Sequence, residues 1–222
     1  DRARAKIGRR IDVMLLNSCL MATIEVVSEL APSVDYLVAS AARIPVVQPF
    51  QLDFLADLGR SYIAPRELSM NIAASLTRDF PIGIVFSAFD LSKTGEVQLA
   101  IKKFAKMYSN LTDSEKELLR RLCAQSKDYG DAFRADLGHF LKLTKKTAGL
   151  SSERRSAVMN LQRILEALTL KVSKRGYKDS QGLSIWFPEI GVEIDDLGSW
   201  YRKTKFDQNA RWSDFLDAVV FR

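Results

Sequence analysis

Apolar and polar positions follow two different periods in the N-terminal part of the chain. Ile11 to Leu16 form a nearly continuous apolar run, which is typical of a strand with both faces covered. From Leu20 to Leu30 the apolar residues recur at helical spacing, and a second apolar run spans Asp35 to Ala39. A strand, a helix and a strand in so short a span predict a βαβ unit with two parallel strands. The pattern therefore indicates an α/β fold.

The rest of the chain continues this mixture of helices and strands. Residues 83–90 and 182–188 are predicted to be strands, and Thr112 and Glu115 have the spacing of a capping box at a helix start. No internal repeat or low-complexity linker divides the chain, so we expect a single domain over residues 1–222. The other predicted elements are a loop at 45–50, helices at 52–60, 65–80, 95–108, 136–146 and 152–172, and short helices around Leu197 and Trp212.

Composition narrows the class of protein. The chain has 222 residues, 47% of them apolar, which fits one globular domain. The net charge of +6 is spread along the chain without an aromatic platform, so nucleic acid is an unfavoured partner. No apolar stretch reaches the roughly eighteen residues of a membrane span, so no membrane contact is predicted. His139, the single histidine, excludes a multi-histidine metal site within this chain, and no metal ligands are predicted.

The first ten residues are strongly basic and run directly into the first predicted strand. They contain neither an initiator methionine nor the pattern of a signal peptide. We therefore expect a fragment or a processed chain, with residues 1–10 lying near a processing site. The basic residues of this segment are Arg2, Arg4, Lys6, Arg9 and Arg10.

Cys19 is the candidate for chemistry, because it lies where the first predicted strand gives way to the first predicted helix. Ligands bind at this edge of an open α/β sheet, and the amides of a helix start would favour a thiolate and could hold an oxyanion. Free cysteine is also a common buried residue, so position alone leaves both interpretations open. Cys123 lies among leucines of a predicted helix, where a packing role is expected.

The segment that contains Cys19 resembles a known family. The run IDVMLLNSCLMATIEVVSELAPSVDYLVAS, Ile11 to Ser40, is similar to the clostripain family of cysteine peptidases, relatives of caspases, legumains and gingipains. In that family a strand ending in Asp-x-Cys-Leu-Met carries the nucleophile. The resemblance implies a caspase-like three-layer sandwich with a mostly parallel central sheet. Further similar segments are FSAFDLSKTGEVQLAIKKFAKM (86–107), ADLGHFLKL (135–143), GLSIWFP (182–188) and FDQNARWSDFL (206–216).

By this resemblance Cys19 is the nucleophile of an endopeptidase acting on polypeptides. Its thiolate would attack a peptide carbonyl to form a thioester acyl-enzyme, which water then hydrolyses. The family's histidine base precedes the cysteine and is followed by glycine, but no histidine lies upstream of Cys19 here. His139 falls in a predicted helix, where a structural or solvated role is expected. Calcium assists some members of the family, although no ligands can be named in this chain.

The missing histidine predicts a mature enzyme of two chains. Members of the family commonly cut themselves between the histidine and the cysteine, and residues 1–10 lie in that interval. The partner would be the N-terminal fragment of the same precursor, carrying His-Gly and completing the sheet. A doubly apolar strand at 11–16 also needs a neighbour on each side. The strands around Leu37 and Val85 could instead flank it on both sides.

Two further residues concern specificity. Asn17 precedes the nucleophile by two positions and shares its face of the strand, where the family typically has Asp to pair with a substrate Arg or Lys. Neutral Asn17 lacks a charge-assisted contact of ~1.5 to 3 kcal/mol, which weakens the expected preference for a basic residue. Asn17 could alternatively cap the following helix. Ser40 matches the serine of a family Val-x-Ser segment near the specificity pocket.

The sequence thus predicts the cysteine-bearing chain of a clostripain-like peptidase. A non-catalytic caspase-like scaffold is the first alternative, because the histidine is missing and Asn17 departs from the family pattern. A basic nucleic-acid-binding domain is the second, supported only by the net charge. The pattern does not indicate a cellular compartment.

Overall fold

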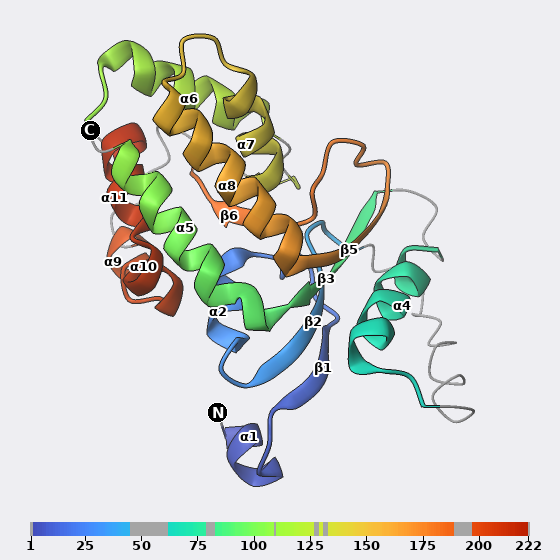
Figure 1. The fold of residues 1–222 in the computed structure, drawn as a ribbon. Helices are drawn as coiled ribbons and strands as arrows, with labels where there is room; N and C mark the ends of the chain where they lie inside the picture. The colour runs from blue at the N-terminus through green and yellow to red at the C-terminus, as the bar shows by residue number, and fades with distance from the viewer. Residues whose placement is uncertain are drawn as a thin grey trace.

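A four-stranded sheet organises the chain in the computed structural model, which describes residues 2–44, 62–78, 83–108, 110–126, 129–130, 133–188 and 197–221 (Figure 1). Its order is β1 (Ile11–Leu16), β2 (Val34–Ser40), β3 (Ile84–Asp90) and β5 (Thr169–Arg175). β1 and β2 are parallel, whereas β3 is antiparallel to both of its neighbours. Three of these four strands therefore run in the same direction, which confirms an α/β fold with a mostly parallel sheet.

The predicted βαβ unit is confirmed. α2 (Ile24–Leu30) connects β1 to β2 and buries Ile24 and Val27 against the core. The side chain of Thr23 accepts a hydrogen bond from the Val26 amide at 3.1 Å and caps the start of the helix. The helix thus begins four residues later than its apolar spacing predicts, because a turn intervenes after β1.

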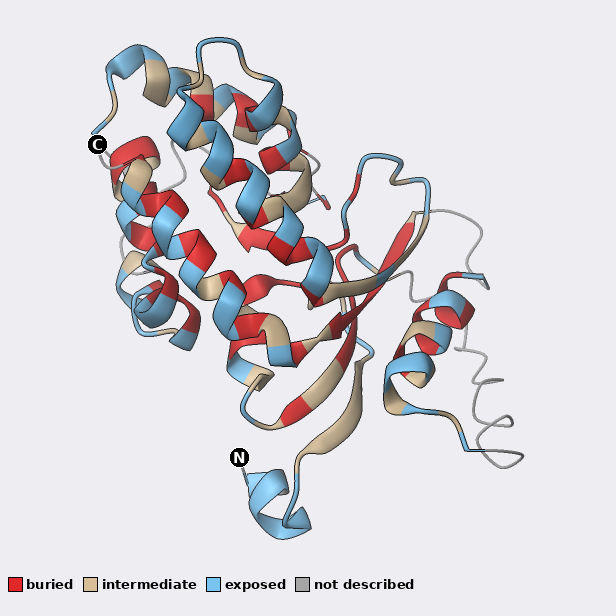
Figure 2. Ribbon diagram, viewed as in Figure 1, coloured by how far each residue is buried: buried red, intermediate tan, exposed pale blue. Residues whose placement is uncertain are grey.

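Helices cover both faces of the sheet. α4 (Pro65–Arg78) packs on one face, and α2, α5 (Thr94–Met107) and α8 (Ser152–Leu168) lie on the other (Figure 1). Side chains along β3 alternate accordingly: Phe86 joins the cluster beneath α4, while Phe89 joins the larger core under α5 and α8. Figure 2 shows buried residues along the strands and the inward faces of these helices. This arrangement is the predicted three-layer sandwich.

The helices over the larger core begin at defined caps. α6 (Asp113–Gln125) begins at the predicted capping box, in which Thr112 and Glu115 exchange hydrogen bonds. α7 (Leu137–Lys146) begins at the cap residue Asp136, whose carboxylate accepts from the His139 amide at 2.8 Å. A 3-10 turn, Leu91–Lys93, leads from β3 into α5.

Two strands lie outside the main sheet. β4 (Arg134–Asp136) and β6 (Ser184–Trp186) form a separate antiparallel pair. The strand predicted at 182–188 is therefore confirmed, but it belongs to this small sheet. The helix predicted at 152–172 is wrong beyond Leu168, because the chain there extends into β5 to pair with β3. The loop predicted at 45–50 and the helix predicted at 52–60 lie outside the described residues.

The basic N-terminal segment contains a short helix, α1 (Arg2–Ile7), where no helix was predicted. The Arg4 side chain donates to the Pro32 carbonyl at 2.8 Å, and Arg10 binds the carboxylate of Asp35 and the carbonyl of Val34. The segment is therefore fixed at the amino end of β1, beside the start of β2 (Figure 1).

The C-terminal elements pack against α2 and α5. They are α9 (Leu197–Tyr201), α10 (Lys205–Ala210), α11 (Trp212–Leu216) and a final π-helical turn, Asp217–Phe221. Fully buried Trp212 donates its indole N–H to the Trp186 carbonyl at 2.8 Å, which ties this region to β6. Within the described ranges, no helix is long and apolar enough to cross a membrane.

Candidate active site

Cys19 lies in a turn just beyond the carboxyl end of β1 and is half-buried. The amide of Ile44 points at its sulfur, with the N and Sγ atoms 3.2 Å apart, and Sγ lies 3.8 Å from the carbonyl oxygen of the same residue. The turn after β1 and the segment that follows β2 therefore meet at the sulfur. This is the predicted edge of the sheet, with the thiol accessible at its surface.

The predicted contact between the thiol and the start of α2 is wrong. α2 begins at Ile24, and the Thr23 side chain already caps its first turn. The N–H group that reaches the sulfur belongs to Ile44. The helix starts late because residues 17–20 form a turn and Thr23 makes a β-bridge to Ser184.

Leu20 gives this turn its shape. Its φ of 59° lies in the left-handed region, which costs an ordinary L-residue about 1 to 2 kcal/mol. Two main-chain hydrogen bonds hold the turn: the Leu20 amide donates to the Ala42 carbonyl at 3.2 Å, and the Ala22 amide donates to the Ser40 carbonyl at 2.9 Å. Such strain persists only where the surrounding structure imposes it, and it concentrates at functional sites.

Ser40 supports the turn from beneath. Its side chain is fully buried, and its hydroxyl lies 2.9 Å from the Ala42 carbonyl and 3.0 Å from the Val85 carbonyl. The same oxygen accepts from the Ala42 amide at 3.2 Å. The hydroxyl is thus occupied inside the protein and fixes Ala42, which in turn holds Leu20. In this conformation Ser40 does not face solvent, and it positions the main chain of Ala42 beside the turn that carries Cys19.

Asn17 is exposed at the end of β1. The interpretation of Asn17 as a helix cap is wrong, because Thr23 caps α2. Its amide makes no hydrogen bond to any residue that the structure describes. Asn17 is therefore free to contact a ligand on the side of the turn that carries Cys19.

His139 lies apart from this turn, in the first turn of α7. Its amide binds Asp136, a buried carboxylate that also accepts hydrogen bonds from the Tyr129 hydroxyl and from the amides of Gln181 and Gly182. Burial raises the pKa of Asp136, although the hydrogen bonds from these groups oppose the shift. The hydrogen-bonding partner of the Cys19 sulfur is Ile44 and not His139.

β1 has one free edge within the described part of the chain. β2 lies between β1 and β3, so the alternative in which β1 is flanked on both sides by the strands around Leu37 and Val85 is wrong. The apolar side chains of β1 are only partly buried, although their pattern predicts covered faces. The described residues also contain no group of three histidine, cysteine or acidic side chains that could hold a metal ion.

Sequence reasoning missed the segment after β2 as part of the site. Ala42 and Ile44 contribute through their main-chain groups, which no residue type in the sequence reveals. The pairing of β1 and β2 was the available signal, because parallel neighbours end at the same edge of a sheet.

Comparisons with known proteins agree with this architecture. The sequence model of the clostripain family, Peptidase_C11, matches residues 4–218. No curated protein matches the chain significantly. Several solved structures share the fold. A cysteine protease from B. fragilis aligns with a TM-score of 0.68 and 15% identity, over 96% of this chain and 91% of that one. A clostripain from Bacteroides thetaiotaomicron ATCC 29148 in complex with a peptide inhibitor aligns with a TM-score of 0.68 and 15% identity, over 94% of this chain and 91% of that one.

The third structure is an inactive zymogen C11 protease from Parabacteroides distasonis, with a TM-score of 0.66 and 14% identity over 94% of this chain and 61% of that one. At these identities the solved structures establish the fold, whereas the family match extends over nearly the whole sequence. With a half-exposed cysteine at the sheet edge and this match, the chain belongs to the clostripain family of cysteine peptidases.

Proposed function

We propose that this chain carries the nucleophile of an endopeptidase and that Cys19 attacks the peptide carbonyl. The thioester forms as the amine departs with a proton from the catalytic base, and water then releases the new carboxylate and the free thiol. The observation that carries this proposal is the half-exposed sulfur in the strained turn after β1, with the Ile44 amide 3.2 Å away. An N–H directed at sulfur stabilises negative charge that develops on it.

The base is proposed to come from a second chain, the N-terminal fragment of the same precursor. The free edge of β1 supports this proposal, because the edge of an apolar strand that faces away from β2 leaves main-chain N–H and C=O groups without partners in the sheet. Strands bearing His-Gly and pairing with β1 would complete the sheet and bring an imidazole to the same edge. This proposal includes processing of the precursor near the basic segment of residues 1–10.

Substrate preference is proposed to depend on Asn17. Its free amide at the end of β1 can accept one hydrogen bond from a basic side chain but supplies no charge. Cleavage after Arg or Lys would therefore be less strongly favoured than with Asp at this position. Ser40 is proposed to act on this pocket indirectly, by fixing the wall through Ala42.

Substitution of the two cysteines and the histidine tests the mechanism. In the full-length protein, Cys19→Ala should abolish peptide hydrolysis and labelling by a thiol-reactive peptide inhibitor. Cys123→Ala and His139→Ala should leave turnover within about twofold of the wild type, since neither side chain acts on the substrate. Equal loss from His139→Ala would contradict the two-chain arrangement.

A non-catalytic scaffold is the alternative that the placement of His139 favours. His139, the only histidine of the sequence, lies in α7, where its main-chain amide donates to the cap residue Asp136. The sulfur of Cys19 is bound by Ile44. A purified protein that contains no His-Gly chain and remains unlabelled at Cys19 would support the scaffold.

A further inference from the structure

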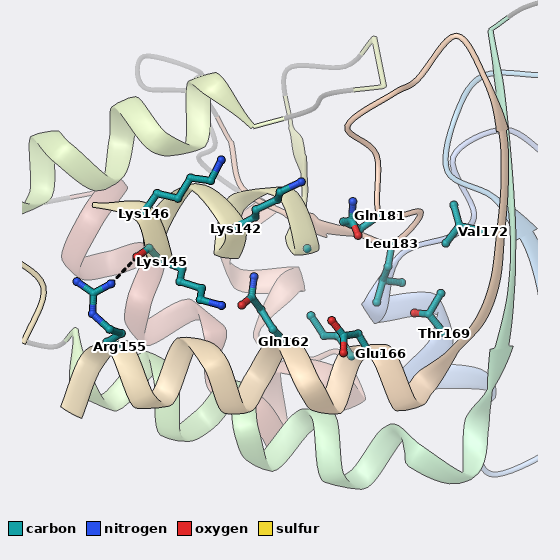
Figure 3. A pocket seen from close by; sticks show the side chains of 12 residues that line it. Lys142, Lys145, Lys146, Arg155, Gln162, Glu166, Thr169, Val172, Gln181 and Leu183 are labelled. Carbon is teal, nitrogen blue, oxygen red and sulfur yellow. Dashed lines mark hydrogen bonds between the residues drawn. The ribbon is translucent and has the colours of Figure 1, made fainter. Parts of the chain in front are cut away.

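A cavity lies between α7, α8, the start of β5 and residues 181–183 (Figure 3). Its volume is about 680 Å³. Binding sites for small molecules typically measure roughly 300 to 1,000 Å³. None of its lining residues belongs to the turn after β1 or to the segment after β2, so the cavity is separate from the candidate active site.

The wall of this cavity is strongly basic. Four cationic side chains and one carboxylate line it, which leaves an excess of three positive charges. The three lysines have the spacing of one helical face, and Figure 3 shows Lys145 extending toward Gln162 across the gap between α7 and α8. The charged residues are Lys142, Lys145 and Lys146 on α7 and Arg155 and Glu166 on α8.

Glu166 is the one carboxylate that lines the cavity with these lysines. Within the described part of the chain Lys142, Lys145 and Lys146 form no ion pair, although like charges at this spacing repel one another. Lys145 and Lys146 lie in the last turn of α7, where their positive charges interact favourably with the negative end of the helix dipole. Lys142 lies one turn earlier, so the helix dipole does not explain why a lysine occupies this position.

The remaining wall is held in place by contacts within the protein. Arg155 donates to the Lys145 carbonyl at 2.8 Å, which fixes its guanidinium at the rim. The main-chain amide of Gln181 donates to the buried carboxylate of Asp136 at 2.7 Å. A Cβ atom at Gly138 would lie 2.5 Å from the Cβ of Gln181, so the chain approaches α7 closely here. Contacts within the protein therefore hold the main chain around the cavity in place, whereas the side chains of the three lysines and Glu166 are exposed.

We propose that this cavity binds a small molecule that carries two or more phosphate groups. One phosphate monoester bears about −1.5 to −2 charges near neutral pH, so two such groups match the excess of three positive charges. Lysine and arginine are the side chains that bind phosphate most readily, and the side-chain amides of Gln162 and Gln181 add neutral donors. Leu165 and Leu183 supply an apolar floor for an organic part of the ligand.

Isothermal titration calorimetry of the full-length protein at fixed ionic strength tests the proposal. The probes are orthophosphate, tripolyphosphate and metal-free adenosine triphosphate. Both polyphosphates should bind at least about tenfold more tightly than orthophosphate, because only they span several cations. Tighter binding of adenosine triphosphate than of tripolyphosphate would identify the ligand as an organic phosphate. Equal binding of the two would identify it as an inorganic polyphosphate. Failure of both polyphosphates to bind would overturn the proposal.

Charge-matched variants distinguish this cavity from general attraction to a basic protein. Lys142→Gln/Lys145→Gln should weaken tripolyphosphate binding at least about tenfold, and Glu166→Gln should strengthen it. Lys102→Gln/Lys103→Gln removes the same charge from the exposed face of α5 and should change the affinity less than about twofold.

Three further results would overturn the proposal: equal loss of affinity in both lysine-pair variants, no gain from Glu166→Gln, or tighter binding of a polyglutamate peptide than of tripolyphosphate. Cys19→Ala should bind the probes as the wild type does, so the outcome is independent of the peptidase proposal. Far-ultraviolet circular dichroism of each variant verifies that α7 and α8 remain folded.

Discussion

The turn around Cys19 and the network around Asp136 are both polar regions at strand ends, but they are built in opposite ways. Asp136 is fully buried, and its carboxylate is surrounded by the Tyr129 hydroxyl and by main-chain donors. The turn at Cys19 is held mainly by main-chain bonds, from Leu20 to Ala42 and from Ala22 to Ser40, with the Ser40 hydroxyl fixing Ala42. Its side chains consequently remain available to a ligand.

This difference separates the groups that hold the fold from those that can react. A buried carboxylate with several donors fixes neighbouring segments, and removing it leaves those donors unpaired. At the sheet edge, main-chain bonds fix the turn, which leaves the thiol of Cys19 half-exposed and the side-chain amide of Asn17 exposed. We therefore expect substitutions in the first region to change stability and those in the second to change activity.

The largest expected effect is on stability, from Asp136→Ala. The loss of its acceptor should lower the free energy of unfolding by about 3 kcal/mol or more, because several buried donors lose their partner. Urea denaturation measures the change. Asp113→Ala is the matched control, because the Asp113 side chain is fully exposed and should cost about 0.5 kcal/mol or less. Similar losses at both positions would remove the contrast.

A smaller effect, on specificity, is expected from Asn17→Asp. The restored charge should raise kcat/KM for substrates with Arg or Lys before the cut by about tenfold to a hundredfold, which corresponds to ~1.5 to 3 kcal/mol. Paired peptides that differ only in this residue give the ratio. Asn160→Asp adds the same charge on the exposed face of α8 and should leave the ratio unchanged. An unchanged ratio in Asn17→Asp would place this residue outside the pocket.

Leu20→Val tests whether the turn is strained. A β-branched residue tolerates the left-handed region poorly, so this change should cost about 1 kcal/mol more than Leu30→Val and should also lower turnover. Leu30 ends α2 with an ordinary backbone conformation and is likewise half-buried, which makes it the matched comparison. Thermal unfolding and peptide hydrolysis provide the two measurements. Equal costs would show that the conformation at Leu20 carries no strain.

The smallest effect concerns pH. Burial raises the pKa of Asp136, so the folded protein holds this proton more tightly than the unfolded chain does. Its stabilising contribution is present in full below the unfolded pKa and is lost as pH rises through the folded pKa. The difference in unfolding free energy between wild type and Asp136→Asn should therefore be larger near pH 4 than at pH 7.

Local patterns predicted the parts of this fold that depend on neighbouring residues. The βαβ unit follows from its change of period, and the capping box at Thr112 fixes the start of α6. β5 was missed because helical spacing continues to Leu168 and only pairing with β3 selects an extended chain beyond it. The direction of β3 likewise depends on the order of strands and not on its own sequence.

The candidate site was predictable only as far as its side chains. Cys19 and Asn17 were found from the strand end and from the family pattern. The donor to the sulfur is the main-chain amide of Ile44, twenty-five positions away, and such a contact leaves no mark on residue type. The sequence indicates Asp136 only as a helix residue, because its hydrogen-bond donors come from segments that meet in the folded state alone.

The anchoring of Arg10 beside Asp35 has a consequence for maturation of the proposed precursor. The basic segment is fixed at one end of β1 and the thiol lies beyond the other, about 20 Å apart for a strand of six residues. If the precursor keeps the same docking, we expect the segment to lie out of reach of the thiol of its own molecule. A cut there would be made by a neighbouring copy, so the fraction processed per minute should rise with precursor concentration.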